Sequence, residues 1–148
     1  MDASVVKTGE GRVINMGPVR LVVLEDGTHT RDTLAIAELT FPPHSPSPFP
    51  HVHHAHEEGF YVLEGELEFK VDGSTIHAGV GDFVMAPIGV PHTFSNPGDV
   101  PARVLNTFTP PRYIHYFEEM STLIATSGPI TREQGRVLMA RYDTEILE

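Results

Sequence analysis

The chain has 148 residues, with 10 Lys and Arg against 20 Asp and Glu, which gives a formal net charge of −10 when histidine is neutral. This length fits one domain, and so acidic a chain disfavours nucleic acid and anionic membranes as partners. Cysteine is absent, so disulfides and thiolate chemistry are excluded and a metal site would need nitrogen and oxygen ligands. The sequence opens without an apolar h-region and no run approaches a membrane span, so we expect a cytoplasmic protein without membrane contact.

The first part of the chain predicts three strands after a loose N-terminal arm. Residues 12–16 and 19–25 flank a Gly-Pro break, and residues 33–41 form a third apolar run. In the third run both alternating faces are largely apolar, so we expect a barrel core on one side and a second subunit, in a homodimer, on the other. The 13 glycines and 13 prolines suit the many turns of an all-β domain.

A proline-rich loop leads into a cluster of histidines. Residues 42–50, PPHSPSPFP, contain too many prolines for a central strand. We therefore expect a stiff loop at the rim of a cavity, with His44 and Phe49 as candidate substrate contacts.

The stretch from His51 to Gly65 provides three candidate metal ligands. His51 and His53 are two residues apart, and Glu58 follows five residues later. Side chains at i and i+2 of a strand point the same way, so both imidazoles can reach one ion. The run after Glu58 is apolar and predicts the next strand, which Gly65 ends with a positive φ.

A second stretch, Gly81 to Asn96, provides the fourth ligand. Glycines and prolines fix turns before His92, and His92, Phe94 and Asn96 then share one face of a short strand. Imidazole and carboxylate ligands suit one divalent transition metal, Fe, Ni, Co, Mn, Cu or Zn, without selecting among them. We predict one metal site from four side chains: His51, His53, Glu58 and His92.

Other features of the histidine cluster have plainer interpretations. A histidine-rich loop can be an accidental metal trap, and only the joint spacing of the four ligands favours a site. We assign His54 and His56 to the solvent side or the rim, and Glu57 is an alternative to Glu58.

The remaining segments predict further strands and then a change of period. Strands are expected at residues 66–71, where apolar and charged residues alternate strictly, at 74–77, and at 102–108. From Thr109-Pro110, a predicted helix start, apolar residues recur at helical spacing until Gly128. Thr131 and Gln134 resemble a capping box for a second helix that runs to about residue 142.

The two ligand stretches resemble the motifs of the cupin family. The first motif, H-x-H, four residues, E, six residues, G, is met from His51 to Gly65. The second motif, G, five residues, P-x-G, two residues, H, three residues, N, is met from Gly81 to Asn96. The sequence departs from the first motif at one position: the glycine that usually opens it is Ser45 here.

The resemblance implies an all-β fold, the double-stranded β-helix or jelly-roll barrel, with a C-terminal helical extension. Residues 1–110 would form the barrel, with motif one at 51–65 and motif two at 81–96, and residues 111–148 would form a helical extension of the same domain. The helices are expected to pack on the barrel for stability or to act as a lid over the cavity, and a homodimer is expected.

The resemblance also implies a function. The arrangement looks like cupin dioxygenases of the quercetin dioxygenase type, so we expect O2-dependent cleavage of a small phenolic or enolisable substrate, with Glu58 as ligand and catalytic base. Alternatives are a metal-dependent isomerase, cyclase or decarboxylase, or a non-catalytic small-molecule-binding cupin. The substrate pocket is expected to be lined by Phe49, Phe60, Val62, Phe83, Met85, Phe94, Tyr113 and Phe117.

Overall fold

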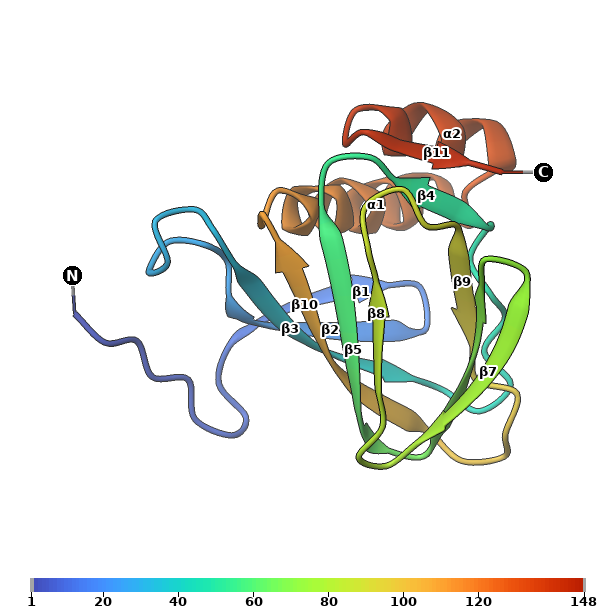
Figure 1. Cartoon of the computed structure of the whole chain (residues 1–148). Coiled ribbons are helices and arrows are strands. Elements are labelled where there is room, and N and C mark those ends of the chain that lie inside the picture. The colour runs from blue at the N-terminus through green and yellow to red at the C-terminus, as the bar shows by residue number, and fades with distance from the viewer. Residues whose placement is uncertain (1, 148) are drawn as a thin grey trace.

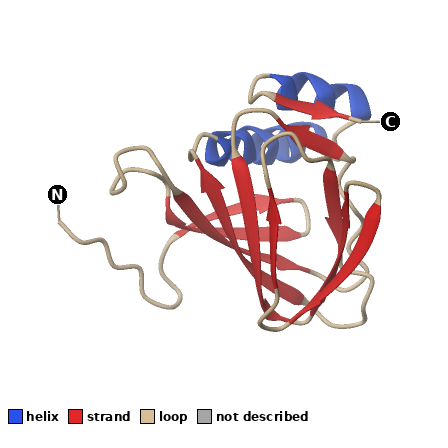
Figure 2. Cartoon of the chain, in the orientation of Figure 1, coloured by secondary structure: helices blue, strands red, loops and turns tan. Residues whose placement is uncertain are grey.

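Two antiparallel sheets make up most of this computed structural model, which describes residues 2–147 (Figures 1 and 2). The six-stranded sheet has the order β1 (Arg12–Met16), β2 (Val19–Glu25), β3 (Ala35–Phe41), β10 (Ala102–Thr109), β5 (Glu57–Glu64) and β8 (Phe83–Ala86). The five-stranded sheet has the order β11 (Thr144–Ile146), β4 (His51–His53), β9 (His92–Ser95), β6 (Glu66–Val71) and β7 (Ser74–Gly79). This confirms the predicted all-β class. Met1 and Glu148, the outer ends of the two predicted segments, lie outside the described residues.

The core lies between the sheets and follows the alternation of their strands. In β3 and β10 every second side chain is buried, and Leu67 and Phe69 of β6 face them with no exposed surface. Fully burying one such side chain contributes about 1.5–3 kcal/mol, so these strands hold the two sheets together.

The first two strands have the predicted bounds, whereas β3 begins two residues later than predicted. The cause is a turn in which Arg31 and Asp32 both have positive φ, at 54° and 59°. The Thr30 hydroxyl closes this turn by donating to the Leu34 carbonyl and accepting from the Leu34 amide. Extended pairing can start only after it, at Ala35.

Gly65 has the positive φ, 70°, that its place in the first motif predicts. A Cβ atom at this position would lie 2.5 Å from the Pro101 carbonyl oxygen. The turn between β5 and β6 therefore needs glycine both for its backbone conformation and for its close approach to the neighbouring chain segment.

Two helices follow the barrel, as predicted, with shifted ends. Helix α1 (Tyr113–Ser127) starts later than expected because β10 stays paired with β5 through Thr109. Helix α2 (Arg132–Ala140) has the predicted capping box: the Thr131 hydroxyl accepts from the Gln134 amide, and the Gln134 side chain accepts from the Thr131 amide. It ends two residues earlier than expected.

The chain ends in a strand that the sequence did not predict. After α2, β11 pairs antiparallel with β4, so that Thr144 lies opposite His53 and Ile146 opposite His51. Figure 1 shows both helices and β11 gathered at the end of the barrel where β4 lies. The three-residue strand is too short to show a hydrophobic period.

Residues 2–11 form an exposed extended arm that leaves the body of the molecule, as expected for the N-terminus (Figure 1). Within residues 2–147, the helices all fall short of the length and apolar character that a membrane crossing needs.

Candidate metal centre

Two neighbouring short strands position the three histidines. β4 pairs antiparallel with β9, and His51 lies directly opposite His92. His53 follows two residues after His51 on the same strand, so its side chain points to the same face. The three imidazole rings lie close together, with ring centroids 4.5–4.9 Å apart.

Glu58 reaches the same point from β5 of the opposite sheet. Its Oε2 lies 2.9 Å from His53 Nε2 and 3.3 Å from His92 Nε2. The four side chains are 1–4% exposed, and one potential ligand atom from each lies within 4.8 Å of all the others. The structure thus brings the four predicted side chains together, whereas Glu57 is exposed and does not replace Glu58.

The far nitrogen of each ring is held by an oxygen atom. His51 Nδ1 lies 2.7 Å from the Phe49 carbonyl, and His92 Nδ1 lies 3.0 Å from the Val90 carbonyl. A carbonyl only accepts, so both Nδ1 atoms carry hydrogen. This leaves Nε2 of both rings to face the centre, which is the orientation that metal-ligating histidines adopt.

The electrostatics of the group also favour a cation. Burial, reinforced by the neighbouring His92 and His53, lowers the pKa of His51 to about 3, so this ring is neutral. Burial alone would raise the pKa of Glu58, but hydrogen bonds from His53 and His92 outweigh it and hold that pKa well below its usual range. A buried carboxylate among three imidazoles needs a positive charge beside it, supplied by a proton or by a metal ion.

The donor set therefore fits a divalent transition metal. It has three nitrogen atoms and one oxygen atom, a composition that suits Fe, Ni, Co, Mn, Cu and Zn, and it leaves room in the coordination sphere for further ligands. The geometry supports a buried His3Glu group that suits a metal ion, and it leaves the identity of the metal open.

The loop of residues 42–50 is tied to the second motif next to this centre. The Thr93 hydroxyl donates to the Pro48 carbonyl at 2.7 Å. Asn96 is 1% exposed, donates through Nδ2 to the carbonyls of Pro42 and Val100, and accepts from the Gly98 amide. These bonds explain why an asparagine stands at the last position of the second motif.

A cavity of about 410 Å³ opens on this centre, with His51 and Glu58 in its wall. Strands, the proline-rich loop and both helices contribute mainly apolar side chains to it. Four of the predicted pocket residues line it: Phe49, Phe94, Tyr113 and Phe117.

The structure does not place the other four predicted pocket residues in the cavity. Phe60 and Val62 have no exposed surface and lie in the core, where Phe60 packs 5.2 Å from Phe94 between ring centroids. Phe83 and Met85 are 55% and 42% exposed, on the outer face of β8. Alternation showed that Phe83 and Met85 share a face, but it did not show which face points inward.

The neighbouring histidines differ from one another. His54 is exposed, as expected, and its Nε2 lies 3.1 Å from Glu145. His44 is also exposed and pairs with Asp99 rather than lining the cavity. The assignment of His56 to the solvent side is wrong: it is 4% exposed, packs 4.0 Å from His53 and 4.6 Å from Tyr113 between ring centroids, and its Nε2 has no partner.

Two residues near the centre were missed by the sequence interpretation. Tyr116 lines the cavity and stacks on Tyr113 with ring centroids 4.3 Å apart. Thr144 Oγ1 lies 2.8 Å from His53 Nδ1. Helical spacing could have placed Tyr116 beside Tyr113, but no local signal connects Thr144 to a ligand 91 residues away.

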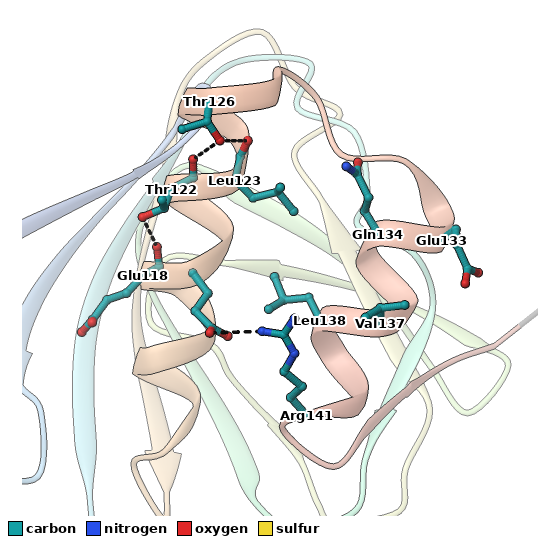
Figure 3. A pocket seen from close by; sticks show the side chains of 10 residues that line it. Glu118, Thr122, Leu123, Thr126, Glu133, Gln134, Val137, Leu138 and Arg141 are labelled. Atoms are coloured by element: carbon teal, nitrogen blue, oxygen red, sulfur yellow. Dashed lines mark hydrogen bonds and ion pairs between the residues drawn. The ribbon is translucent and has the colours of Figure 1, made fainter.

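A larger hollow lies on the other side of α1 but has none of this chemistry. Figure 3 shows this groove between α1 and α2, about 710 Å³ in volume, with Leu123, Val137 and Leu138 along it. Its charged side chains are already paired, as Arg141 with Glu119. None of the four ligand candidates lines it, so the smaller cavity is the candidate site.

Comparisons with known proteins agree with this fold and site. The family described as "Cupin domain" matches residues 37–108. Quercetin 2,3-dioxygenase of Bacillus subtilis is 33% identical over 89 residues, which are 60% of this chain and 26% of that protein. The HTH-type transcriptional regulator PuuR of Escherichia coli is 30% identical over 111 residues, 74% of this chain and 59% of that protein. The solved structure of KdgF from Halomonas sp. has a TM-score of 0.65 at 19% identity and covers 74% of this chain and 94% of its own.

The chain thus spans 26% and 59% of the lengths of these two relatives. Two facing antiparallel sheets with a His3Glu group near one end define a jelly-roll protein with a candidate metal site, which confirms the predicted architecture. With the family match over residues 37–108, these features support a small protein of the cupin superfamily.

Proposed function

We propose that this chain is a metal-dependent dioxygenase that cleaves a small phenolic or enolisable compound, of the type that quercetin 2,3-dioxygenase represents. The observation that supports it best is a buried His3Glu group in the wall of a mainly apolar cavity. The 33% identity to the Bacillus subtilis enzyme favours this reaction over others that the same scaffold hosts.

In this proposal His51, His53, Glu58 and His92 hold one divalent transition metal, Fe, Ni, Co, Mn, Cu or Zn. Such an ion would supply Lewis acidity and, when redox-active, a means of using O2. The chain itself holds the imidazoles in place through the oxygen atoms at their Nδ1 atoms.

Glu58 is proposed as both ligand and proton acceptor. Its pKa is held well below the usual range, because the hydrogen bonds from His53 and His92 outweigh the effect of burial, so the carboxylate is ionised at neutral pH. It lies in the cavity wall, where an enol or phenol hydroxyl of a bound compound can donate to it.

The cavity wall indicates the substrate class. Among the described residues that line it, none is a lysine or an arginine, and Glu58 adds a negative charge. An anionic substrate would therefore have only the metal to balance its charge. Aromatic and aliphatic walls instead suit a neutral, largely apolar molecule, with phenylalanines from three parts of the chain, Phe41, Phe94 and Phe117, available for packing.

Metal analysis followed by oxygen uptake tests the proposal. Protein purified without an affinity tag should hold about one equivalent of transition metal, as expected for one four-ligand site. It should then consume O2 with flavonols or β-diketones and show no turnover without oxygen. Glu58→Gln should lose the rate. Oxygen-independent turnover would instead indicate an isomerase, cyclase or decarboxylase, and absence of metal after reconstitution would refute the site.

A non-catalytic small-molecule-binding cupin is the second candidate. It is favoured by the similarity to a transcriptional regulator, which extends over 74% of this chain. Ligand affinity separates the two: a binding protein should keep most of its affinity in Glu58→Gln and show no turnover.

We also propose a homodimer in the cytoplasm. The outer face of the six-stranded sheet exposes apolar side chains, Tyr61, Phe83 and Met85, at 42–55% of their surface. In register they adjoin one another, since Tyr61 pairs with Phe83 and Gly59 with Met85. A second copy would cover this patch. A sequence without cysteine suits a reducing compartment.

A further inference from the structure

One ligand of the candidate metal centre depends on the last described part of the chain. His53 Nδ1 faces a side chain, the hydroxyl of Thr144, at 2.8 Å, whereas the other two histidines face backbone carbonyls. Thr144 belongs to β11, beyond both helices.

The hydrogen bonds around Thr144 determine which way it can act on His53. The Thr144 hydroxyl has one hydrogen, and it donates this hydrogen to the Tyr142 carbonyl at 3.2 Å. Its oxygen can then only accept from His53, so Nδ1 carries hydrogen. In the metal-free chain Nε2 faces the Glu58 carboxylate, which only accepts, so a metal ion reaches the Nε2 lone pair by replacing the hydrogen of that bond while Nδ1 keeps its own.

Removing the hydroxyl would take away the partner that keeps hydrogen on Nδ1. Without an acceptor at Nδ1, the remaining partner of His53 is the Glu58 carboxylate, 2.9 Å from Nε2. A neutral ring would then place its hydrogen on Nε2 to satisfy that bond. A metal ion bound at Nε2 would have to displace this hydrogen and would leave a buried Nδ1 hydrogen without an acceptor.

The backbone holds Thr144 firmly in place. β11 pairs with β4 on the far side from β9, as Figure 1 shows at the end of the barrel. The His54 amide donates to the Asp143 carbonyl and the Leu147 amide to the Pro50 carbonyl, each at 2.8 Å. Thr144 itself is 3% exposed, so water does not compete for its hydroxyl.

We propose that Thr144 is a positioning residue for the metal centre, which fixes the tautomer and ring orientation of His53 and thereby makes the C-terminal segment part of the site. The inference rests on the proposed metal site, but not on the reaction. Side chains that orient a metal-ligating histidine typically change metal affinity by 10- to 100-fold.

Three variants of β11 test the proposal through metal affinity. Thr144→Val keeps the shape and removes the hydroxyl, Thr144→Ser keeps the hydroxyl, and Glu145→Ala is a control on the exposed side of the same strand. Competition titration with Co²⁺ and Zn²⁺ should show affinity weaker by about 10- to 100-fold for Thr144→Val. The serine variant and the Glu145 variant should stay close to the wild type.

Nitrogen NMR of His53 provides a second readout that needs neither metal nor activity. In the wild type Nδ1 should carry hydrogen with and without metal, and in metal-free Thr144→Val only Nε2 should carry hydrogen. A wild-type ring protonated at Nε2 alone would overturn the proposal even if the valine variant failed to fold. Equal Co²⁺ affinity in folded Thr144→Val and wild type would also overturn it.

Failure of the metal site itself would look different. If the wild type binds neither Co²⁺ nor Zn²⁺, the proposed metal-dependent function is refuted, and the NMR result alone decides whether Thr144 orients His53. If the wild type binds metal and the valine variant binds it equally well, only the role of Thr144 is refuted.

Discussion

The two faces of the six-stranded sheet differ in chemistry although the same strands make both. On β5, Glu58, Phe60 and Val62 point inward and are at most 3% exposed, whereas Tyr61 between them is 42% exposed. The inner face joins a metal-ligand candidate to the core, and the outer face carries unpaired apolar groups. Burial therefore separates the site from a candidate contact surface within one strand, and substitutions on the two faces should have separable effects.

The largest expected effect is loss of stability on the inner face. Phe60→Ala removes a ring with no exposed surface that contacts Phe69 and Phe94, so the free energy of unfolding should fall by about 3–5 kcal/mol. Urea denaturation of dilute protein measures it. Tyr61→Ala, on the outer face, is the matched control and should cost far less. Similar losses for both variants would remove the distinction between the faces.

The second largest expected effect is a loss of metal affinity, and it should occur only when the substituted histidine is buried. His53→Ala removes a candidate ligand that is 1% exposed and should weaken binding by more than about 100-fold, beyond the range for residues that only orient a ligand. His54→Ala changes the adjacent residue, which is exposed and paired with Glu145, and should leave affinity unchanged. Zn²⁺ competition titration measures both. Equal loss in His54→Ala would point to an adventitious surface site.

The pH dependence of metal binding tests the buried ligand group itself. Burial opposes protonation of His92, but its hydrogen bond to Glu58 outweighs burial and raises the pKa of His92 above its ordinary value. A metal must displace that proton, so affinity should fall as pH decreases through this raised pKa, by up to about tenfold per pH unit. Co²⁺ titrations between about pH 6 and 8 cover the range in which histidine titrates. A flat profile would contradict proton displacement.

The smallest expected effect on the fold comes from the outer face. Phe83→Glu replaces a side chain that is 55% exposed, so it should change the unfolding free energy by less than about 0.5 kcal/mol in the isolated chain. It should weaken self-association by about tenfold or more, because it puts a charge in the proposed contact. Analytical ultracentrifugation gives the association constant. A wild type that stays monomeric at high concentration would refute the dimer.

Spacing within short segments was enough to predict the metal-ligand candidates. It could not predict how side chains lie relative to distant parts of the fold. The i, i+2 histidines and the turn residues before His92 act over a few residues, so the sequence shows them directly. The orientation of β8 depends on its pairing with β5, so Phe83 and Met85 were placed on the wrong face. His56 was likewise misplaced, because its burial comes from Tyr113 and Phe108, far along the chain.

Because β11 pairs with β4, the residues of the centre are synthesised at well-separated times. His53 and Thr144 are 91 residues apart, and ribosomes add about 5–20 residues per second. His53 is therefore made about 5–18 seconds before the threonine that faces it. Throughout that interval a nascent chain displays the first motif without its last strand. The centre is completed only after Thr144 has been added, when the other strands of the barrel have already been made to enclose it.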